Sequence, residues 1–314
     1  MKEIVVGSRG SELALRQAHW VVSRIIEAYP DISCRIEVIK TTGDRIIDSP
    51  LAAIGDKGLF VKEIELALIN GEIDIAVHSA KDLPSDMDER LSIAAYTERE
   101  DPRDALVSKS GKLSELPIGA SVGTSSARRR AQILHYRPDL NIRDLRGNLD
   151  TRLRKLCGPD YDAIILACAG LRRMNLESRI SEAIPMNISI PAAGQGALAV
   201  QCRAGEHIAD ILSSLDHPQT RRCVCSERTV IAALEAGCRT PVGVNGRESD
   251  DIIALDAMVA SVDGSRMIRK SLSGSADDWE DIGRRMADEL RDAGAEDLLE
   301  EARYGATNDI GAAG

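Results

Sequence analysis

Three consecutive arginines follow a turn in the segment GTSSARRR, which begins at Gly123. The glycine permits a tight turn after an apolar strand, and Ser125 or Ser126 can cap the helix that follows. Backbone N–H groups at such a helix terminus favour an anion. Arg128 and Arg129 would lie in the first helical turn, where their charge opposes the helix dipole. Two readings explain that placement: an anionic ligand bridges the two side chains, or they are a surface accident.

Other basic residues occupy the same kind of position, after apolar runs that predict strands. They are Arg9, Lys81, Arg146, Arg152, Arg172 and Arg173. In open α/β sheets, strand-to-helix junctions line the ligand crevice. Because guanidinium groups bind carboxylates bidentately, the pattern indicates a ligand with several carboxylates or phosphates. The absence of a GxxxxGK[ST] motif argues against a P-loop nucleotide site.

Two more positions carry side chains that could do chemistry. The pair Lys81–Asp82 in VHSAKDLPS is a candidate acid/base element, and a surface ion pair in a turn is the alternative. In EAGCRTPVG, Cys238 follows Gly237, and the neighbouring Arg239 favours the thiolate. This cysteine is either a nucleophile or covalent anchor, or a buried and inert thiol.

The stretch Thr41–Gly58 fits neither the helical nor the strand period. Loops of this length in compact domains are usually lids or disordered segments, so we expect one or the other. Phe60, the single phenylalanine of the chain, comes at the end of this stretch. It either belongs to a core or stacks on a ring of a ligand.

Composition narrows the class of protein. The 314 residues carry a formal net charge of -10, which argues against general nucleic-acid binding. No apolar run approaches the roughly 20 residues that span a bilayer, and the first residues lack the features of a secretory signal. Seven cysteines without a CxxC pair are typical of a reduced, cytoplasmic protein. We therefore expect a cytoplasmic protein with no metal and with no nucleic-acid or membrane partner.

The apolar patterns predict an α/β fold. Expected strands are 4–6, 35–39, 73–77, 120–122, 142–145, 163–167, 197–202, 252–260 and 267–272. Expected helices are 12–28, 62–69, 126–136, 149–156, 219–236, 277–293 and 296–304. The strand–helix rhythm restarts after Pro102, which indicates two similar lobes with a cleft between them.

These elements predict three domains. We expect a first lobe of residues 1–98 plus 196–216, a second lobe of 103–192 and a smaller α+β domain of 218–314. The late strand 197–202 would return to the first lobe. The acidic residues between 277 and 301 fit a solvated helical face better than a site.

Nine sequence blocks, taken together and in this order, resemble the porphobilinogen deaminase (hydroxymethylbilane synthase) family. They are SRGSELAL, GDKGLFVKEIE, DIAVHSAKDLPS, EREDPRDA, VGTSSARRR, LRGNLDTRL, YDAIILACAGLRR, PAAGQGALAVQCR and EAGCRTPVG. The resemblance runs from about Val5 to the C-terminal helices. It implies three α/β domains, the first two built like periplasmic binding proteins, and a monomer. It also implies a transferase that joins four porphobilinogen molecules head to tail, with loss of ammonia, and then hydrolyses off a linear tetrapyrrole.

The resemblance assigns roles to individual residues. Cys238 would carry a dipyrromethane primer through a thioether, and Asp82 would be the catalytic carboxylate. Cofactor-binding residues would be Ser79, Lys81, Thr124, Ser126, Arg128 and Arg129. Residues that hold substrate and product carboxylates would be Arg9, Ser11, Gln17, Arg146, Arg152 and Arg173, with Phe60 packing on a pyrrole ring. Because each pyrrole ring of the growing chain carries an acetate and a propionate, many arginines are then required.

Two positions depart from the family pattern. Ala53 stands where many bacterial members carry lysine, and Arg130 stands where a neutral residue is expected. The alternative function is a non-catalytic two-lobed binding protein for a polyanionic small molecule. It would explain the arginines but would leave Asp82 and Cys238 without a use.

Overall fold

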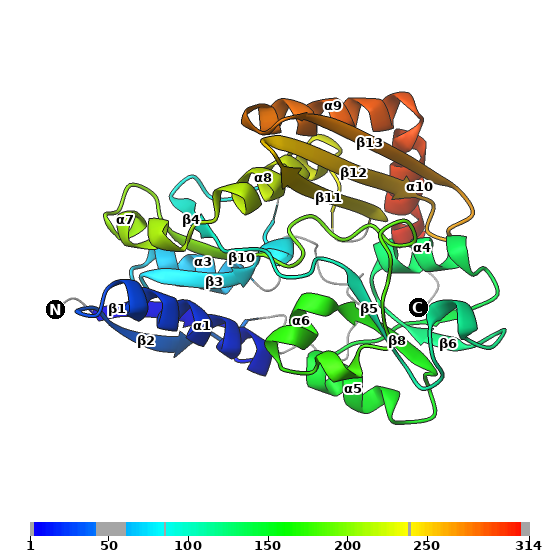
Figure 1. The fold of residues 1–314 in the computed structure, drawn as a ribbon, viewed down its shortest axis with the longest axis horizontal. Helices are drawn as coiled ribbons and strands as arrows, with labels where there is room; N and C mark the ends of the chain where they lie inside the picture. Colours follow the sequence, from blue (N-terminus) through cyan, green and yellow to red (C-terminus); the bar gives the residue numbers. More distant parts are fainter. Residues whose placement is uncertain (1–2, 42–60, 85, 238–239, 309–314) are drawn as a thin grey trace. The chain divides into compact units, whose positions relative to one another are not determined.

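Two five-stranded sheets and one three-stranded sheet make up the α/β fold of the described chain (Figure 1). The structure is a computed structural model that describes residues 3–41, 61–84, 86–237 and 240–308, with side chains through residue 303. The described residues divide into two units. The first unit takes those up to residue 100 together with 196–221, and the second takes 101–195 together with 222–308.

The strands of the first unit are β1 (Glu3–Ser8), β2 (Ser33–Val38), β3 (Ile75–Ser79), β4 (Leu91–Tyr96) and β10 (Leu198–Arg203). Their order in the sheet is β2-β1-β3-β10-β4. Strand β1 is parallel to β2 and β3, whereas β10 is antiparallel to β3 and β4. The late strand β10 therefore lies in the first sheet, as expected.

Helices of the first unit include α1 (Glu12–Ala28), α3 (Lys62–Ile69) and α7 (Ile208–Leu212). Helix α1 begins where Ser11 accepts a hydrogen bond from the backbone N–H of Ala14 at 3.3 Å, which satisfies one of the unpaired donors of the first turn. Its buried face includes Val21 and Ile25, which pack in one core with Ile75 of β3. Burial of this apolar stripe fixes the helix against the sheet.

The second unit repeats this topology. Its strands are β5 (Asp104–Ser108), β6 (Ser121–Gly123), β7 (Asn141–Arg143), β8 (Ala163–Ala167) and β9 (Glu182–Ala183). Their order is β7-β6-β8-β5-β9, with β6 parallel to β7 and β8, and β5 antiparallel to β8 and β9. The helices after the parallel strands are α4 (Ala127–Tyr136), α5 (Leu149–Leu156) and α6 (Cys168–Arg173).

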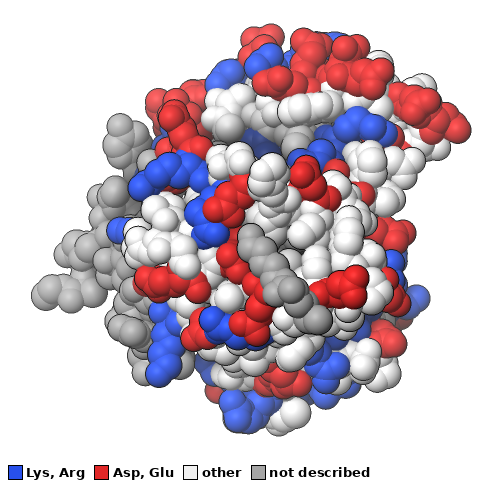
Figure 2. Space-filling view, turned by 90° about the vertical axis from the view of Figure 1, so that its left-hand side faces the viewer, with Lys and Arg blue, Asp and Glu red and all other residues white. Residues whose placement is uncertain are grey.

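The C-terminal part of the second unit has its own sheet and core. The antiparallel strands β11 (Val242–Ser249), β12 (Ile252–Ala260) and β13 (Met267–Ser275) pack with α8 (Pro218–Ala233), α9 (Trp279–Asp292) and α10 (Ala295–Asn308). Leu255, Met286 and Leu290 are among its buried residues. Most of the acidic residues of α9 and α10 are exposed, as expected, and acidic side chains crowd the top of the view in Figure 2, where α9 lies.

The predicted α/β class is confirmed, and several predicted elements have their expected bounds. The agreement is complete for α1, α3, α5, β8 and β12. Strands β4, β5, β9 and β11 were not predicted, and β5 and β10 make both large sheets mixed rather than parallel. In the described ranges of the chain, none of the helices is long and apolar enough to cross a membrane.

Candidate active site

The first unit gathers predicted site residues at one edge of its sheet. Because β1 and β3 are parallel, their carboxyl ends meet at the same edge. Arg9 directly follows β1, and a short 3-10 turn of Ala80, Lys81 and Asp82 directly follows Ser79, the last residue of β3. Lys81 is half-buried and Asp82 is exposed.

Two further predicted residues join the same edge from helix α1. Gln17 is buried, and its side-chain amide donates a hydrogen bond to the hydroxyl of Ser79 at 3.2 Å. Ser11 caps the helix through its side-chain oxygen. The structure therefore brings a residue predicted to bind substrate into contact with one predicted to bind the cofactor.

A buried polar chain lies behind this edge. The ring Nε2 of His78 lies 3.0 Å from Oε1 of Gln201, whose amide nitrogen donates to Glu65 at 2.9 Å and to the sulfur of Met87 at 3.2 Å. Because that nitrogen donates on the Glu65 side, Oε1 accepts, and Nε2 of His78 carries the hydrogen. Burial lowers the pKa of His78 to about 4, and the charge of Asp82 opposes this shift. His78, which sequence reasoning treated as a packing residue, is thus a neutral neighbour of the predicted catalytic carboxylate.

The second unit gathers the other predicted residues at the corresponding edge of its sheet. Thr124 follows β6, and its hydroxyl oxygen accepts from the backbone N–H of Ser126 at 3.2 Å. Ser126 in turn caps helix α4 by accepting from the backbone N–H of Arg129 at 3.4 Å. Arg173 ends helix α6, which follows the parallel strand β8. Thr124 and Ser126 therefore lie between a strand and the helix that follows it, as the sequence predicted.

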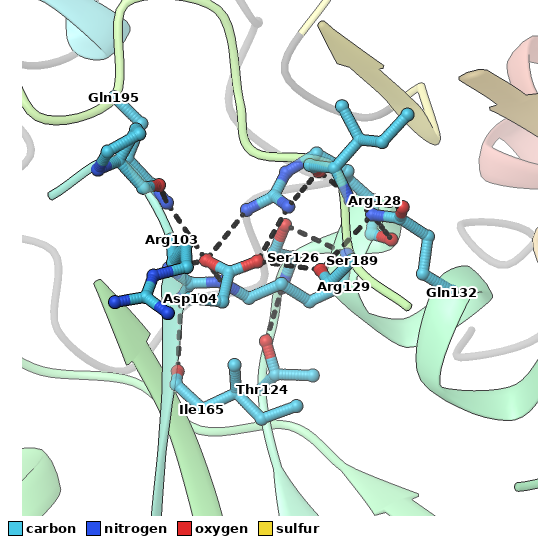
Figure 3. Close-up of polar contacts among 12 residues, drawn as sticks. Arg103, Asp104, Thr124, Ser126, Arg128, Arg129, Gln132, Ile165, Ser189 and Gln195 are labelled. Carbon is cyan, nitrogen blue, oxygen red and sulfur yellow. Dashed lines mark hydrogen bonds and ion pairs between the residues drawn. The ribbon is translucent and has the colours of Figure 1, made fainter. Parts of the chain in front are cut away.

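The arginine pair at this edge surrounds a buried carboxylate. Asp104, the first residue of β5, is fully buried, and Arg128 and Arg129 are about 5% and 6% exposed. Arg128 donates to both oxygens of Asp104 at 2.7 and 3.1 Å, and Arg129 donates to Oδ1 from Nε at 2.9 Å. Ser189 and Gln195 complete the shell with bonds of 2.8 and 3.0 Å. Figure 3 shows these side chains converging on Asp104.

The electrostatics follow from this geometry. The two guanidinium groups hold the pKa of Asp104 far below its usual value, although burial alone would raise it. Burial lowers the pKa of Arg129, and the charge of Asp104 opposes that shift. Two positive groups facing one negative group leave one positive charge in excess. The first anion for the arginine pair is therefore a residue of this chain.

Asp104 is the functional candidate that sequence reasoning missed. It lies in the block EREDPRDA, 24 residues before Arg128 along the chain. The spacing of the residues gives no sign of this partner. The signal was instead a physical requirement, because two arginines that are buried together need a buried counter-ion. The sequence alone offered two aspartates in that block, Asp101 and Asp104, and no way to choose between them.

The remaining predicted residues take different places. Arg146 is half-buried between β7 and α5, and Arg152 on α5 donates to the backbone oxygen of Gly147 at 2.7 Å. Arg130 is half-buried. Outside the described residues lie Ala53, Phe60, Cys238 and all of the expected loop after Thr41. Among the described residues, no group of three or more His, Cys, Asp or Glu side chains could hold a metal ion.

The arginine pair fits an additional carboxylate. Six interactions, five hydrogen bonds and one ion pair, account for N–H groups of the two guanidiniums. Three hydrogen bonds come from Arg128, to Asp104 and to the backbone oxygen of Ile190. Arg129 makes two hydrogen bonds, to Asp104 and to the backbone oxygen of Ile165, and an ion pair with Asp104. A guanidinium has five N–H groups, so donors remain beyond these six. Remaining donors and one excess positive charge suit an anionic group at the N-terminus of α4.

Comparison with known proteins agrees with this chemistry. Residues 4–210 match the family model of the porphobilinogen deaminase dipyrromethane cofactor binding domain, and residues 221–292 match that of the porphobilinogen deaminase C-terminal domain. The porphobilinogen deaminase of Moorella thermoacetica is 49% identical over 305 residues, covering 96% of this chain and 97% of the relative. That of Geobacter metallireducens is 46% identical over 301 residues, covering 96% and 95%.

Similarity to solved structures is much weaker. The methionine binding protein MetQ is 14% identical and aligns with 74% of this chain and 94% of its own, with a TM-score of 0.41. The sequence relatives, by contrast, span almost the whole chain and share one activity, which the alternative of a non-catalytic binding protein does not provide for. The chain belongs to the porphobilinogen deaminase family, the transferases of tetrapyrrole biosynthesis that condense porphobilinogen on a dipyrromethane cofactor to form hydroxymethylbilane.

Proposed function

We propose that Asp82 is the catalytic carboxylate of this enzyme and that Cys238 carries the cofactor through a thioether. The observation that supports the role of Asp82 is its place at the carboxyl edge of the first sheet, exposed and beside the neutral His78. A neutral imidazole does not cancel the negative charge of a neighbouring carboxylate. The carboxylate of Asp82 can therefore attract a cation that forms on the substrate.

The step that needs this charge is the loss of ammonia from porphobilinogen. The C–N bond of the aminomethyl group breaks, the nitrogen leaves with the electron pair, and a cationic methylene-pyrrolenine remains. At about 4 Å and an effective dielectric constant near 20, attraction to a carboxylate is worth about 4 kcal/mol. Since about 1.4 kcal/mol is a factor of ten, this attraction accounts for roughly a thousandfold in rate.

Asp82 also has a role in moving protons. Its carboxylate oxygen can accept the proton that the condensing α-carbon loses when the new C–C bond forms and then pass it to the released ammonia. When bound, the dipyrromethane supplies the terminal ring to which the first substrate molecule is joined. A single carboxylate that alternates between these tasks returns to its ionised form after every addition.

The other assignments concern binding. We propose that the cofactor is held by Ser79, Lys81, Thr124, Ser126, Arg128 and Arg129. The carboxylates of substrate and product would be held by Arg9, Ser11, Gln17, Arg146, Arg152 and Arg173, with Phe60 against a pyrrole ring. The hydrogen bond between Gln17 and Ser79 supports a shared surface for the two sets in the first unit. The excess positive charge around Asp104 supports a carboxylate subsite in the second.

The proposal extends to organisation and location. We propose three domains, of residues 1–98 plus 196–216, 103–192 and 218–314, and the separate core of the C-terminal sheet supports the last of them. We further propose a cytoplasmic monomer that acts on porphobilinogen without nucleic-acid or membrane partners. The net charge of -10 and the seven cysteines without a CxxC pair support these assignments.

The decisive experiment separates Asp82 from Cys238. Asp82→Asn keeps the shape of the side chain but removes its charge, so turnover should fall by about 100-fold or more while a preassembled cofactor stays attached. Cys238→Ser should lack the covalent dipyrrole, because a hydroxyl is a far poorer nucleophile than a thiolate at neutral pH. Intact mass measures the attachment, and steady-state assay measures the turnover.

A matched control is available near the catalytic turn. Asp86 is also an exposed aspartate, and Asp86→Asn should leave turnover within about twofold, as is usual for a surface charge. If Asp82→Asn turns over as fast as Asp86→Asn, the catalytic role is wrong. If Cys238→Ser still carries the full adduct, another cysteine is the anchor.

A further inference from the structure

Asp104 is the point at which three segments of the second unit meet. The carboxylate belongs to the first residue of β5, the two arginines lie in the first turn of α4, and Ser189 and Gln195 come from the segment that follows β9. We propose that Asp104 is a positioning residue, which holds Arg128 and Arg129 in a fixed arrangement so that their remaining N–H groups bind a carboxylate of the dipyrromethane. This inference rests on the proposed roles of the two arginines.

The fold itself does not require a carboxylate at this place. In the second sheet, Asp104 pairs with Ala167, the last residue of β8. In the first sheet, the residue in the corresponding position is Leu198, which begins β10 and pairs with Ser79, the last residue of β3. Leu198 is as buried as Asp104, at about 1% exposed. The same topology is therefore completed by an apolar side chain in one sheet and by an ionic group in the other.

A buried ionic cluster also adds little to the free energy of folding. Desolvating a buried ion pair can cost more than the attraction returns, and well-packed apolar residues of similar volume are often as stable or more so. The cluster does confer geometric specificity, because a carboxylate with several charge-assisted donors fixes the planes of both guanidiniums. Fixed guanidiniums lose little conformational entropy when they bind an anion.

The surrounding bonds make the arrangement rigid. Arg129 also donates to the backbone oxygen of Ile165 at 3.0 Å. Gln132, one helical turn after Arg128, accepts from the backbone N–H of Ile190 at 2.7 Å and donates to its oxygen at 3.0 Å. Helix α4 is thus tied to β8 and to the segment 189–195 around the same carboxylate. Such support is what a preorganised binding group needs.

The experiment measures cofactor loading rather than turnover. Full-length chains are produced without cofactor and supplied with porphobilinogen, and intact mass follows the appearance of the adduct well below the melting temperature of each variant. Asp104→Asn should slow loading by about 100-fold, the order expected for binding groups displaced by about 1 Å. The porphobilinogen concentration for half-maximal loading should also rise, whereas a purely structural defect would lower only the fraction of competent chain.

The matched control is Asp101→Asn. Asp101 also pairs with arginines, Arg103 and Arg172, and its side chain is about 8% exposed. This variant should load within about twofold of the parent chain, because the arginines it releases are not those assigned to the cofactor. If Asp104→Asn is folded and loads as fast as Asp101→Asn, the positioning role is overturned.

A second variant covers the case in which Asp104→Asn does not fold. Asp104→Asn combined with Arg129→Gln leaves one guanidinium and no carboxylate, so the net charge of the cluster equals that of the parent chain. Slower loading of this double variant than of Arg129→Gln alone supports positioning, and equal or faster loading overturns it, because charge alone would then suffice. Arg129→Lys tests the underlying assignment separately. If Arg129→Lys loads normally, the cofactor role of Arg129 falls; if only Asp104→Asn loads normally, the positioning role alone falls.

Discussion

The two large sheets share one topology and differ in what lies at the same edge. In the first sheet the edge has an exposed carboxylate, Asp82, near the buried and neutral His78. In the second sheet the edge has a buried carboxylate, Asp104, enclosed by Arg128 and Arg129. One edge thus carries an exposed carboxylate together with Arg9 and Lys81, and the other a buried carboxylate with a positive excess. Duplicated architecture therefore does not imply duplicated chemistry: the residue that starts the antiparallel strand is apolar in the first sheet and a carboxylate shared by two arginines in the second.

The largest expected effect comes from making the first sheet resemble the second. Leu198→Asp would bury a carboxylate without the arginines that enclose Asp104, at a cost on the order of 5 kcal/mol in the free energy of unfolding. Burial should raise the pKa of the introduced carboxyl. A raised pKa means that the loss is largest above that pKa and becomes smaller as pH falls toward the ordinary aspartate value, which urea unfolding at several pH values measures.

Leu198→Asn is the control, since it has the same shape and does not ionise. The two variants should converge in stability at low pH, where the introduced carboxyl is protonated. Equal stability of Leu198→Asp and the parent chain at neutral pH would contradict the comparison, because the first sheet would then accept a charge as readily as the second.

A smaller effect that distinguishes the two edges is the pH dependence of the free energy of unfolding. The pKa of His78 is lowered by burial from 6.5 to about 4, so between these values the unfolded chain binds a proton that the folded chain does not. The free energy of unfolding should therefore fall by about 3 kcal/mol as pH decreases from 6.5 to 4. His78→Gln keeps a donor for Gln201 and should lack this part of the pH dependence.

The contribution of Asp104 to the free energy of unfolding should change only in a more acidic pH range. Its pKa is lowered, so its stabilisation is present above the ordinary aspartate value and is lost only as pH falls below that value. Because this contribution is common to the parent chain and His78→Gln, the difference between their unfolding curves isolates the histidine. Parallel curves between pH 7 and 4 would mean that His78 is not held neutral by burial.

The smallest expected effect concerns helix caps. Ser126→Ala removes the cap of α4 and should cost about 1 kcal/mol, and Asn148→Ala, which removes the cap of α5, should cost about the same. The two variants should differ in cofactor content, because only Ser126 is assigned to the cofactor. Thermal unfolding measures the first quantity and intact mass the second. Equal cofactor content would reduce Ser126 to a capping residue.

Local signals explain which elements were predictable. Helix α1 has a serine cap at its start and Pro30 directly after Tyr29, so both of its ends follow from neighbouring residues. Strands β5 and β9 are short, and β5 finds its partner β8 about 60 residues further along the chain. Pairing across such a distance leaves no local pattern. The mixed character of both sheets could not be predicted for the same reason.

The site was predictable in kind but not in detail. Two arginines in the first turn of a helix indicated an anion, and an anion is present in the form of Asp104. Sequence reasoning looked for that anion in a ligand, because a counter-ion on another strand leaves no trace in the spacing of the arginines. The role of His78 was hidden similarly, since its partner Gln201 lies on β10, far along the chain.

The cluster around Asp104 also limits how many ligand carboxylates the arginine pair can neutralise. Counted by residue, the turn GTSSARRR offers two buried cations, but with Asp104 ionised at all physiological pH values the pair acts toward a ligand as a monovalent site. One carboxylate then saturates its charge. A primer whose every ring carries an acetate and a propionate must find its other counter-ions elsewhere, and Lys81 is the cation of the first unit that we propose for the cofactor. Arginine counts in this family therefore overstate ligand valence wherever a buried carboxylate shares the guanidiniums.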